Sequence, residues 1–473
     1  MENEDYKISA ENAPEKQPKS ILLRKLATLR KGAAPTVESA QPADEAFGGA
    51  SPLTAQAAAA APAAQEQPEG ADTPEEEEQP KLTDREVMEH TASIWRYRPI
   101  VDDGTEQHSE YHAKYTRTAD AEIMAARARG KKHKHEGSNC DDWFETAETD
   151  GCIIAVVSDG AGSKPLSRIG ARVCCETAVQ YLKRELSRLI AENTSLKADL
   201  ADEMGGERFM AACGAVAPLV QNAAREAFGA VIEELKAVYN IQSYADAIRR
   251  KPVLADLYST FLAAVVIPLE QIGESFVVST QIGDGCICAV DSSADSEHCL
   301  KLLGQADSGA FSGETDFLSE KNIASGVIAG KTRISRGRSD VIMVMSDGVA
   351  DDYFPPNPMM KRLYLDLCLN GILPMQGDIS TAEDPAPMRF KSVSMSGRSV
   401  ELQYTKQLMA GQEPEIINML WDKRGSLRCH SLEAFGITLG KQPQERLLTW
   451  VDNYNERGSF DDRTLVVIRL DKK

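Results

Sequence analysis

The stretch "IIAVVSDGAG" (residues 153–162) is an apolar run that ends on an acid and a glycine. Five consecutive apolar residues predict a strand that is buried on both faces. Its single charge, Asp159, comes at the very end. Taken alone, an Asp-Gly pair after a strand is typical of a turn.

The same pattern recurs along the chain. "VIMVMSDGVADD" places Asp347 after a second apolar run, "FVVSTQIGDG" places Asp284 after a third, and Asp461 and Asp462 precede a fourth in "DDRTLVVIRL". Antiparallel strands can bring several such carboxylates to one rim of a sheet, where they repel one another unless cations lie between them. Oxygen ligands without a matching His or Cys set favour Mg²⁺ or Mn²⁺ over zinc. The glycine beside each acid lets a carbonyl or a bulky substrate approach without a Cβ in the way.

Composition narrows the class of protein. The 473 residues are 42% hydrophobic, which is enough for a full core, and the net charge of −19 argues against a nucleic-acid or anionic-membrane surface. With no apolar stretch of about 18 residues and an acidic start, "MENEDYKISAENAPEK", the sequence predicts a cytoplasmic protein without a transmembrane segment.

The ten cysteines include no Cys-x-x-Cys pair, and they are predicted to be reduced core residues. Cys286 and Cys288 would face the same side of a strand, where a metal site or a disulfide is the alternative to ordinary packing.

The chain is expected to have two parts. Residues 1–81 are predicted to be disordered, with a basic amphipathic segment at 18–32 and an Ala/Pro/Glu-rich linker at 33–81. The segment 18–32 is either a peptide that docks on a partner or touches a membrane surface, or a weakly helical, solvated piece. Residues 82–473 are expected to fold as one domain. Within it, residues 371–440 are expected to be an insertion of loops and a helix.

Periodicity predicts a mixed fold. Long helices are expected at 167–191, 207–239 and 443–455. A helical pair between groups of strands does not fit the alternation of a doubly wound sheet, so antiparallel sheets covered by helices, in the α+β class, fit better. The predicted strands are 122–129, 152–158, 258–267, 275–282, 286–290, 327–334, 340–345 and 464–470.

Together these motifs resemble metal-dependent protein phosphatases of type 2C, and in particular a bacterial branch that opens with G-x-x-H and C-x-D. The resemblance runs from about residue 120 to the C-terminus and implies a four-layer α/β/β/α sandwich with metals at one end. The segments, in family order, are "GKKHKHEGSNCDD" (130–142), "VSDGAGSKPLSRIGA" (157–171), "STFLAAVV" (259–266), "QIGDG" (281–285), "SGETDFLSE" (312–320), "MSDGVAD" (345–351) and "DDRTLVVI" (461–468).

The resemblance also implies roles for single residues. Two bridged ions, Mg²⁺ or Mn²⁺, would activate a water that attacks a phosphoserine or phosphothreonine. Asp284 matches an acid that helps to hold a third ion. The expected partners are a phosphorylated protein substrate and a cognate serine/threonine kinase. Positions that match the ligands of the two main ions are Asp142, Asp159, the carbonyl of Gly160, Asp347 and Asp461.

The chain departs from the family pattern at two positions. Ala161 stands where many members carry a histidine that protonates the leaving alcohol, and Gly137 stands where many carry a phosphate-binding arginine. The nearby substitutes are Lys131, Lys132, His133 and His135. His133, which matches the opening motif, is expected to be a phosphate contact or proton donor, with a purely structural histidine as the alternative.

Two other functions fit the sequence. The departures favour a catalytically silent relative that binds phosphoproteins or serves as a scaffold, whereas the intact acids favour an enzyme. A third hypothesis is hydrolysis of a small phosphorylated metabolite. Hydrolysis of an aryl phosphate with Mn²⁺ against EDTA, and of phosphopeptides against metabolites, would separate the three.

Overall fold

The computed structural model describes residues 96–294, 298–306, 316–374, 390–396, 399–404, 427–428, 438–453 and 460–471. All of these belong to the compact unit Leu82–Lys473. The predictions for residues 1–81, including the segment 18–32 and the linker 33–81, therefore lie outside the described residues. So does the first part of the predicted motif at 312–320.

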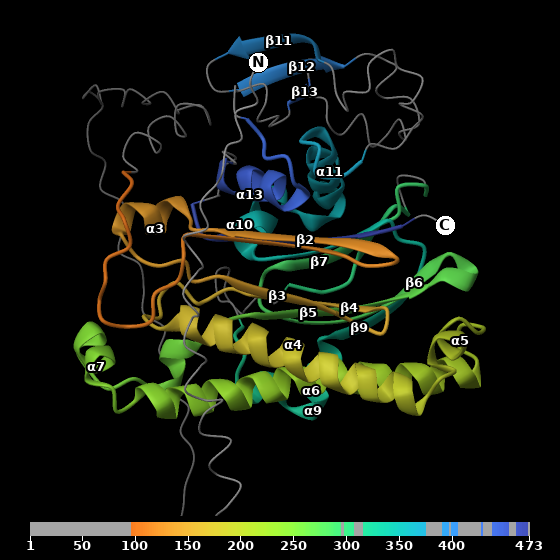
Figure 1. Ribbon diagram of the computed structural model, residues 1–473, viewed down its shortest axis with the longest axis horizontal. Coiled ribbons are helices and arrows are strands. Elements are labelled where there is room, and N and C mark those ends of the chain that lie inside the picture. Colours follow the sequence, from red (N-terminus) through yellow and green to blue (C-terminus); the bar gives the residue numbers. More distant parts are fainter. Residues whose placement is uncertain are drawn as a thin grey trace, which may run out of the picture. The chain divides into compact units, whose positions relative to one another are not determined.

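The core is built from two antiparallel sheets that lie face to face (Figure 1). The six-stranded sheet has the order β1 (Tyr111–Arg117), β2 (Ala121–Ala128), β14 (Arg463–Leu470), β10 (Val341–Met345), β7 (Cys286–Val290) and β8 (Leu300–Leu302). The five-stranded sheet has the order β3 (Trp143–Thr149), β4 (Cys152–Ser158), β5 (Phe261–Leu269), β6 (Glu274–Ile282) and β9 (Thr332–Gly337).

Helices cover the outer face of each sheet (Figure 1). The long helices α4 (Ser167–Glu192) and α6 (Glu207–Val238) lie on the five-stranded sheet, and α11 (Pro356–Leu369) and α13 (Pro443–Asn453) lie on the six-stranded sheet. The predicted four-layer α/β/β/α sandwich is thus confirmed. The shorter helices are α3 (Lys131–Glu136), α5 (Leu196–Leu200), α7 (Gln242–Ile248), α8 (Glu320–Ile323), α9 (Ser325–Gly330) and α10 (Asp347–Ala350), with 3₁₀ turns η2 (Leu254–Leu257), η3 (Glu270–Ile272) and η4 (Asp351–Tyr353).

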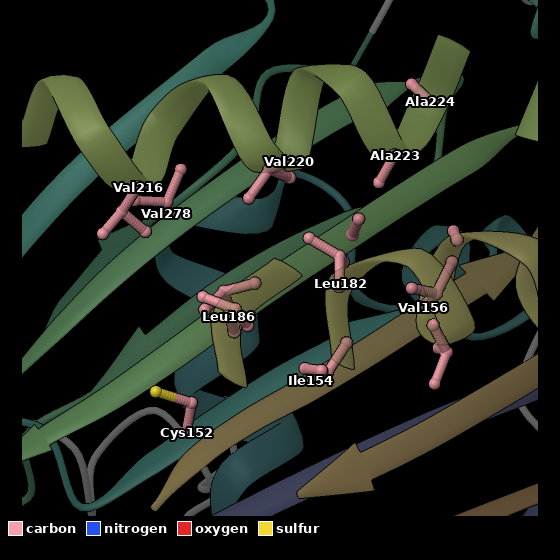
Figure 2. Packing of buried hydrophobic residues seen from close by; sticks show 14 of the residues in the cluster. Cys152, Ile154, Val156, Leu182, Leu186, Val216, Val220, Ala223, Ala224 and Val278 are labelled. Carbon is pink, nitrogen blue, oxygen red and sulfur yellow. The ribbon is translucent and has the colours of Figure 1, made fainter. Parts of the chain in front are cut away.

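The position of β4 between the helical layer and the opposite sheet explains why its sequence is apolar throughout. Side chains alternate along a strand, so Ile154 and Val156 point to the helical layer while Ile153 and Val157 point to the opposite sheet. All four are buried. Figure 2 shows the helical side of this strand, where Ile154 and Val156 lie near Leu182 and Leu186 of α4; Val216 and Val220 of α6 cover another part of the same sheet, near Val278 of β6.

The strands that the sequence missed or misplaced are the edges of the two sheets. Strands β1, β3 and β8 were not predicted, and the predicted strand 327–334 is wrong over its first half, because residues Ser325–Gly330 form α9 and β9 begins at Thr332. Only Ile328 of α9 is buried. An apolar run this short is compatible with either a helix or a strand.

The proposed insertion at 371–440 is described only in part. Its described residues include a three-stranded antiparallel sheet with the order β11 (Phe390–Ser396), β12 (Ser399–Tyr404) and β13 (Leu427–Arg428). The sequence predicted loops and a helix here and no strand, so that part of the prediction is wrong. Across the described ranges, no helix combines the length and apolar character needed to cross a bilayer.

Candidate metal centre

Strand register places the predicted acids opposite one another in pairs. In the five-stranded sheet Trp143 of β3 pairs with Ser158 of β4, so one step further Asp142 lies opposite Asp159. In the six-stranded sheet Met345 of β10 pairs with Cys286 of β7. Two steps beyond that pair, the same register brings Asp347 opposite Asp284.

The two pairs come together at one end of the sandwich, joined by Asp461. One carboxylate oxygen from each of Asp159, Asp284 and Asp347 lies within 4.8 Å of the others. The charge of Asp461 acts on both Asp159 and Asp347. We call Asp142, Asp159, Asp284, Asp347 and Asp461 the acid cluster.

Glycines allow the acid-bearing turns to approach the neighbouring backbone. A Cβ on Gly160 would lie 2.8 Å from the carbonyl oxygen of Asp141, and one on Gly348 would clash with the carbonyl oxygen of Asp462. Gly160 also forms a β-bridge with Ser259. The glycine of each Ser-Asp-Gly turn therefore has a steric role, because any side chain would push the turn away from the acids beside it.

Crowding and burial act together on the ionisation of the cluster. Burial raises the pKa of Asp159 well above its usual range, and the charges of Asp347, Asp142 and Asp461 raise it further. Burial and the charges of Asp284 and Asp461 do the same to the pKa of Asp347. The pKa of Asp142 rises to about 6, again through burial first. Without cations, these carboxyl groups hold protons at pH values where ordinary aspartates have lost them.

The free atoms of the cluster fit divalent cations. Asp142 Oδ1 and Asp347 Oδ1 are buried, and within the described ranges neither accepts a hydrogen bond from an N–H or hydroxyl group; both carboxyl groups lie against that of Asp159. A buried carboxylate oxygen without a donor is unfavourable unless a cation lies beside it. An all-oxygen set of this kind suits Mg²⁺ or Mn²⁺.

A buried ion pair supports the cluster from one side. His133, which is 3% exposed, makes a 2.8 Å contact from Nδ1 to Asp462 Oδ2. Burial opposes protonation of this imidazole, but the charge and hydrogen bond of Asp462 outweigh it and raise the pKa of His133 to about 10. Asp462 also accepts hydrogen bonds from the backbone N–H groups of Gly130 (2.5 Å) and Asp141. Asp462 thereby ties its own segment to the start of α3 and to the segment before β3, and Asp461 lies in the same group of possible ligands as His133 and Asp462.

This geometry bears on the predicted role of His133. A buried imidazolium held by Asp462 favours a positioning role. Its predicted role as a phosphate contact or proton donor stays a prediction. Ala161, at the position of the absent histidine, is itself buried.

Four residues at the centre were not among the predicted ligands or phosphate contacts. Ser346 and Thr464 donate hydrogen bonds to Asp142, Asp462 holds His133, and Asp351 lies near enough for the charges of Asp284 and Asp461 to act on it. Asp462 and Asp351 each stand in a doubled acid, "DD", in the quoted motifs. The hydroxyl residues carry no comparable sequence signal, because a single Ser or Thr at a strand end is common.

Comparisons with known proteins give one family. A family model described as "Protein phosphatase 2C" matches residues 129–368, just over half of the chain. A search of curated proteins found no match.

Solved structures give low similarity scores. RsbX in complex with magnesium is 11% identical, with 76% of this chain and 100% of that chain covered and a TM-score of 0.29. A bacterial serine phosphatase is 12% identical, with 74% and 98% covered and a TM-score of 0.33. A phosphatase from a pathogenic strain of Toxoplasma gondii is 11% identical, with 77% and 96% covered and a TM-score of 0.37.

Proposed function

The chain belongs to the protein phosphatase 2C family, a family of metal-dependent protein phosphatases, and we propose that it hydrolyses phosphoserine and phosphothreonine in proteins. The observation that carries this proposal is the convergence of the acid cluster, whose members lie up to 319 residues apart in sequence, from Asp142 to Asp461. A cognate serine/threonine kinase that phosphorylates the same substrates is part of the proposal.

The acid cluster would hold two divalent ions, Mg²⁺ or Mn²⁺. Asp142, Asp159, Asp347 and Asp461, with the carbonyl of Gly160, are the proposed ligands, and Asp284 is proposed to help hold a third ion. When bound, the ions would lower the pKa of a water between them and offset charge on the phosphoryl oxygens. The chain's own contribution is to keep these oxygens fixed and buried before the ions arrive.

Lys132 is the cation that we propose to bind the substrate phosphate. Its backbone N–H donates a 2.9 Å hydrogen bond to Phe460, beside Asp461, and its ammonium lies 3.9 Å from where a Cβ on Gly162 would stand. The side chain is half-buried. Its neighbours His133 and Lys134 are paired with carboxylates, whereas within the described ranges Lys132 forms no ion pair. An ammonium near Gly162 that forms no ion pair within the described ranges is available to a dianionic phosphate.

The leaving alcohol needs a proton source other than residue 161. Alanine has no proton to donate, and His133, with a pKa of about 10, is a weak acid at neutral pH. We therefore propose that solvent water protonates the serine or threonine oxygen. This assignment expects activity to lack the decline above about pH 6.5 that deprotonation of a histidine donor of ordinary pKa would give.

The test is hydrolysis of a phosphothreonine peptide during titration with Mg²⁺ and with Mn²⁺, compared with EDTA. We expect metal-dependent release of phosphate from the peptide. Binding of the peptide without release would favour the silent, phosphoprotein-binding relative. Faster release from small phosphorylated metabolites than from the peptide would favour the third hypothesis.

A further inference from the structure

Asp142 lies at the junction of the two sheets. It directly precedes β3 of the five-stranded sheet, yet its Oδ2 atom accepts hydrogen bonds from two residues on the side of the six-stranded sheet, one directly after β10 and one in β14. Ser346 Oγ donates over 2.8 Å and Thr464 Oγ1 over 2.6 Å. All three side chains are fully buried, with 0% exposure.

The two donors are also bonded to each other. The backbone N–H of Thr464 donates to Ser346 Oγ over 3.0 Å, and the backbone N–H of Ser346 donates to the carbonyl of Thr464 over 3.1 Å. The Ser346 hydroxyl therefore accepts one hydrogen bond and donates the other to Asp142. This closed arrangement of Asp142, Ser346 and Thr464 is called the hydroxyl clamp below.

The clamp fixes which oxygen of Asp142 is free. Two donors occupy Oδ2, and Oδ1 is buried without a donor in the described part of the chain. Rotation of the carboxylate would break both hydrogen bonds inside a dry core, where an unpaired polar atom is costly.

The clamp also joins segments that carry other members of the acid cluster. Ser346 directly precedes Asp347, and Thr464 follows Asp461 by three residues. A displacement of either strand end would therefore move a hydrogen-bond donor of Asp142 and disturb the position of its carboxylate. The clamp is the point at which the ligands of one sheet are tied to those of the other.

We propose that Ser346 and Thr464 are positioning residues that hold Asp142 Oδ1 toward the cations and lock the two halves of the metal centre into one preorganised site. The inference rests on the proposed function, since it assumes that the acid cluster binds metal. Partners of metal ligands that do not touch the metal themselves typically contribute 10–100-fold to metal affinity. The alternative is that the two hydroxyls only stabilise a buried carboxylate.

The test compares Thr464→Val with Thr464→Ser in the full-length chain. Valine keeps the shape of threonine but removes the donor, whereas serine keeps the hydroxyl. The readouts are the Mn²⁺ dissociation constant, from the electron paramagnetic resonance signal of free Mn²⁺, and the unfolding free energy in EDTA. We expect Thr464→Val to weaken Mn²⁺ binding about 10–100-fold, and Thr464→Ser to stay within about threefold of wild type.

A matched control separates positioning from stability. Thr149 is a buried threonine at the opposite end of β3, where its hydroxyl lies 2.8 Å from Ser187 Oγ. Thr149→Val should lower stability without changing the Mn²⁺ dissociation constant. If Thr464→Val does not fold, Ser346→Ala, which removes the other donor, decides the question by the same measurement.

Each result has a distinct meaning. Loss of affinity in Thr464→Val with recovery in Thr464→Ser supports the clamp. Equal Mn²⁺ affinity in wild type and Thr464→Val, or in wild type and Ser346→Ala, overturns it while leaving the proposed function intact. A wild-type protein that binds no Mn²⁺ overturns the proposed function, and the inference with it.

Discussion

At the scale of single residues, Asp347 combines burial with strong repulsion. Its pKa lies well above the usual value because the side chain is buried close to Asp284 and Asp461. The variant Asp347→Asn should lose at least about 1,000-fold in turnover of a phosphothreonine peptide, since bound metal contributes several kcal/mol of transition-state stabilisation. Its stability in EDTA should equal or exceed that of wild type, because the substitution removes a buried carboxyl group that must either carry a repelled charge or take up a proton in the folded state.

A surface acid provides the control for this prediction. Asp246, exposed on α7, accepts a 2.7 Å hydrogen bond from Gln242. Asp246→Asn should keep full turnover. An Asp347→Asn protein that retained full activity would exclude Asp347 from the metal centre.

Lys132 allows a second prediction with a control on the same short helix. Lys132→Ala should lower kcat/KM for the phosphopeptide about 10-fold or more, since a hydrogen bond to a charged group is worth about 1.5–3 kcal/mol. Lys132→Arg should recover most of it. Lys134→Ala should have little effect, because Lys134 is already paired with Asp452 at 2.5 Å. The three variants are compared by steady-state kinetics at saturating metal. Equal kcat/KM for Lys132→Ala and wild type would refute the proposal that Lys132 binds the substrate phosphate.

The carboxylates of the acid cluster were easier to predict from the sequence than the hydroxyl residues that donate hydrogen bonds to them. Asp159, Asp284 and Asp347 could be found because a charge at the end of an apolar strand stands out from its surroundings. Ser346 and Thr464 could not, because their importance depends on a contact between two sheets that the local sequence does not encode. The resemblance to a family supplied Asp142, which follows no apolar run.

At the scale of elements, the segment that precedes β1 is tied to α4 by an ion pair. Arg172 donates to both oxygens of Glu106, at 2.5 and 3.0 Å. Burial alone would raise the pKa of Glu106, but hydrogen bonds from His108 and Arg172 and the charge of Arg172 lower it to about 2. A pKa depressed in the folded state contributes stability above the unfolded value of about 4.5, and this stability is lost as the pH falls toward 2.

The variant Glu106→Gln tests that contribution. It should be less stable than wild type by about 1–3 kcal/mol near neutral pH, with allowance for partial exposure of the glutamate. The difference should shrink as the pH is lowered from about 5 to about 3, measured by urea unfolding at each pH. Glu233→Gln, which breaks the exposed pair with Lys236, should show almost no difference at any pH. A gap between Glu106→Gln and wild type that stays constant with pH would contradict the assigned ion pair.

Edge strands were harder to predict from the sequence than central strands. Central strands such as β4 and β10 are buried on both faces and read as unbroken apolar runs. Strands β1 and β3 have only one neighbour each and include polar, half-buried residues, as in "YHAKYTR" and "WFETAET". Because their pairing is decided by a partner far away in the chain, the local pattern is too weak to reveal them.

At the scale of the whole molecule, the fold class followed from how the chain is organised. A helical pair placed between groups of strands excluded a doubly wound sheet, and the structure has two antiparallel sheets with α4 and α6 on one outer face. The fold carries the acid cluster at one end of two stacked sheets. It follows that the stability of the molecule should depend on what occupies that end.

Metal and pH should therefore act together on the stability of the protein. The pKa of Asp142 is about 6 in the folded protein without metal, against 3.8 for an ordinary aspartate, so the folded state binds more protons than the unfolded chain between these values. Stability without metal falls as the pH rises through this range, by up to about 3 kcal/mol for this one group.

Cations remove the repulsion between the carboxylates, but at low pH they must displace the protons first. The increase in melting temperature on replacing EDTA with excess Mn²⁺ should thus be small near pH 5 and large near pH 7.5, as measured by calorimetry. Asp347→Asn should show little increase at either pH. A metal-induced increase that is equal at both pH values, or larger at the lower one, would mean that protons and cations do not compete for the acid cluster.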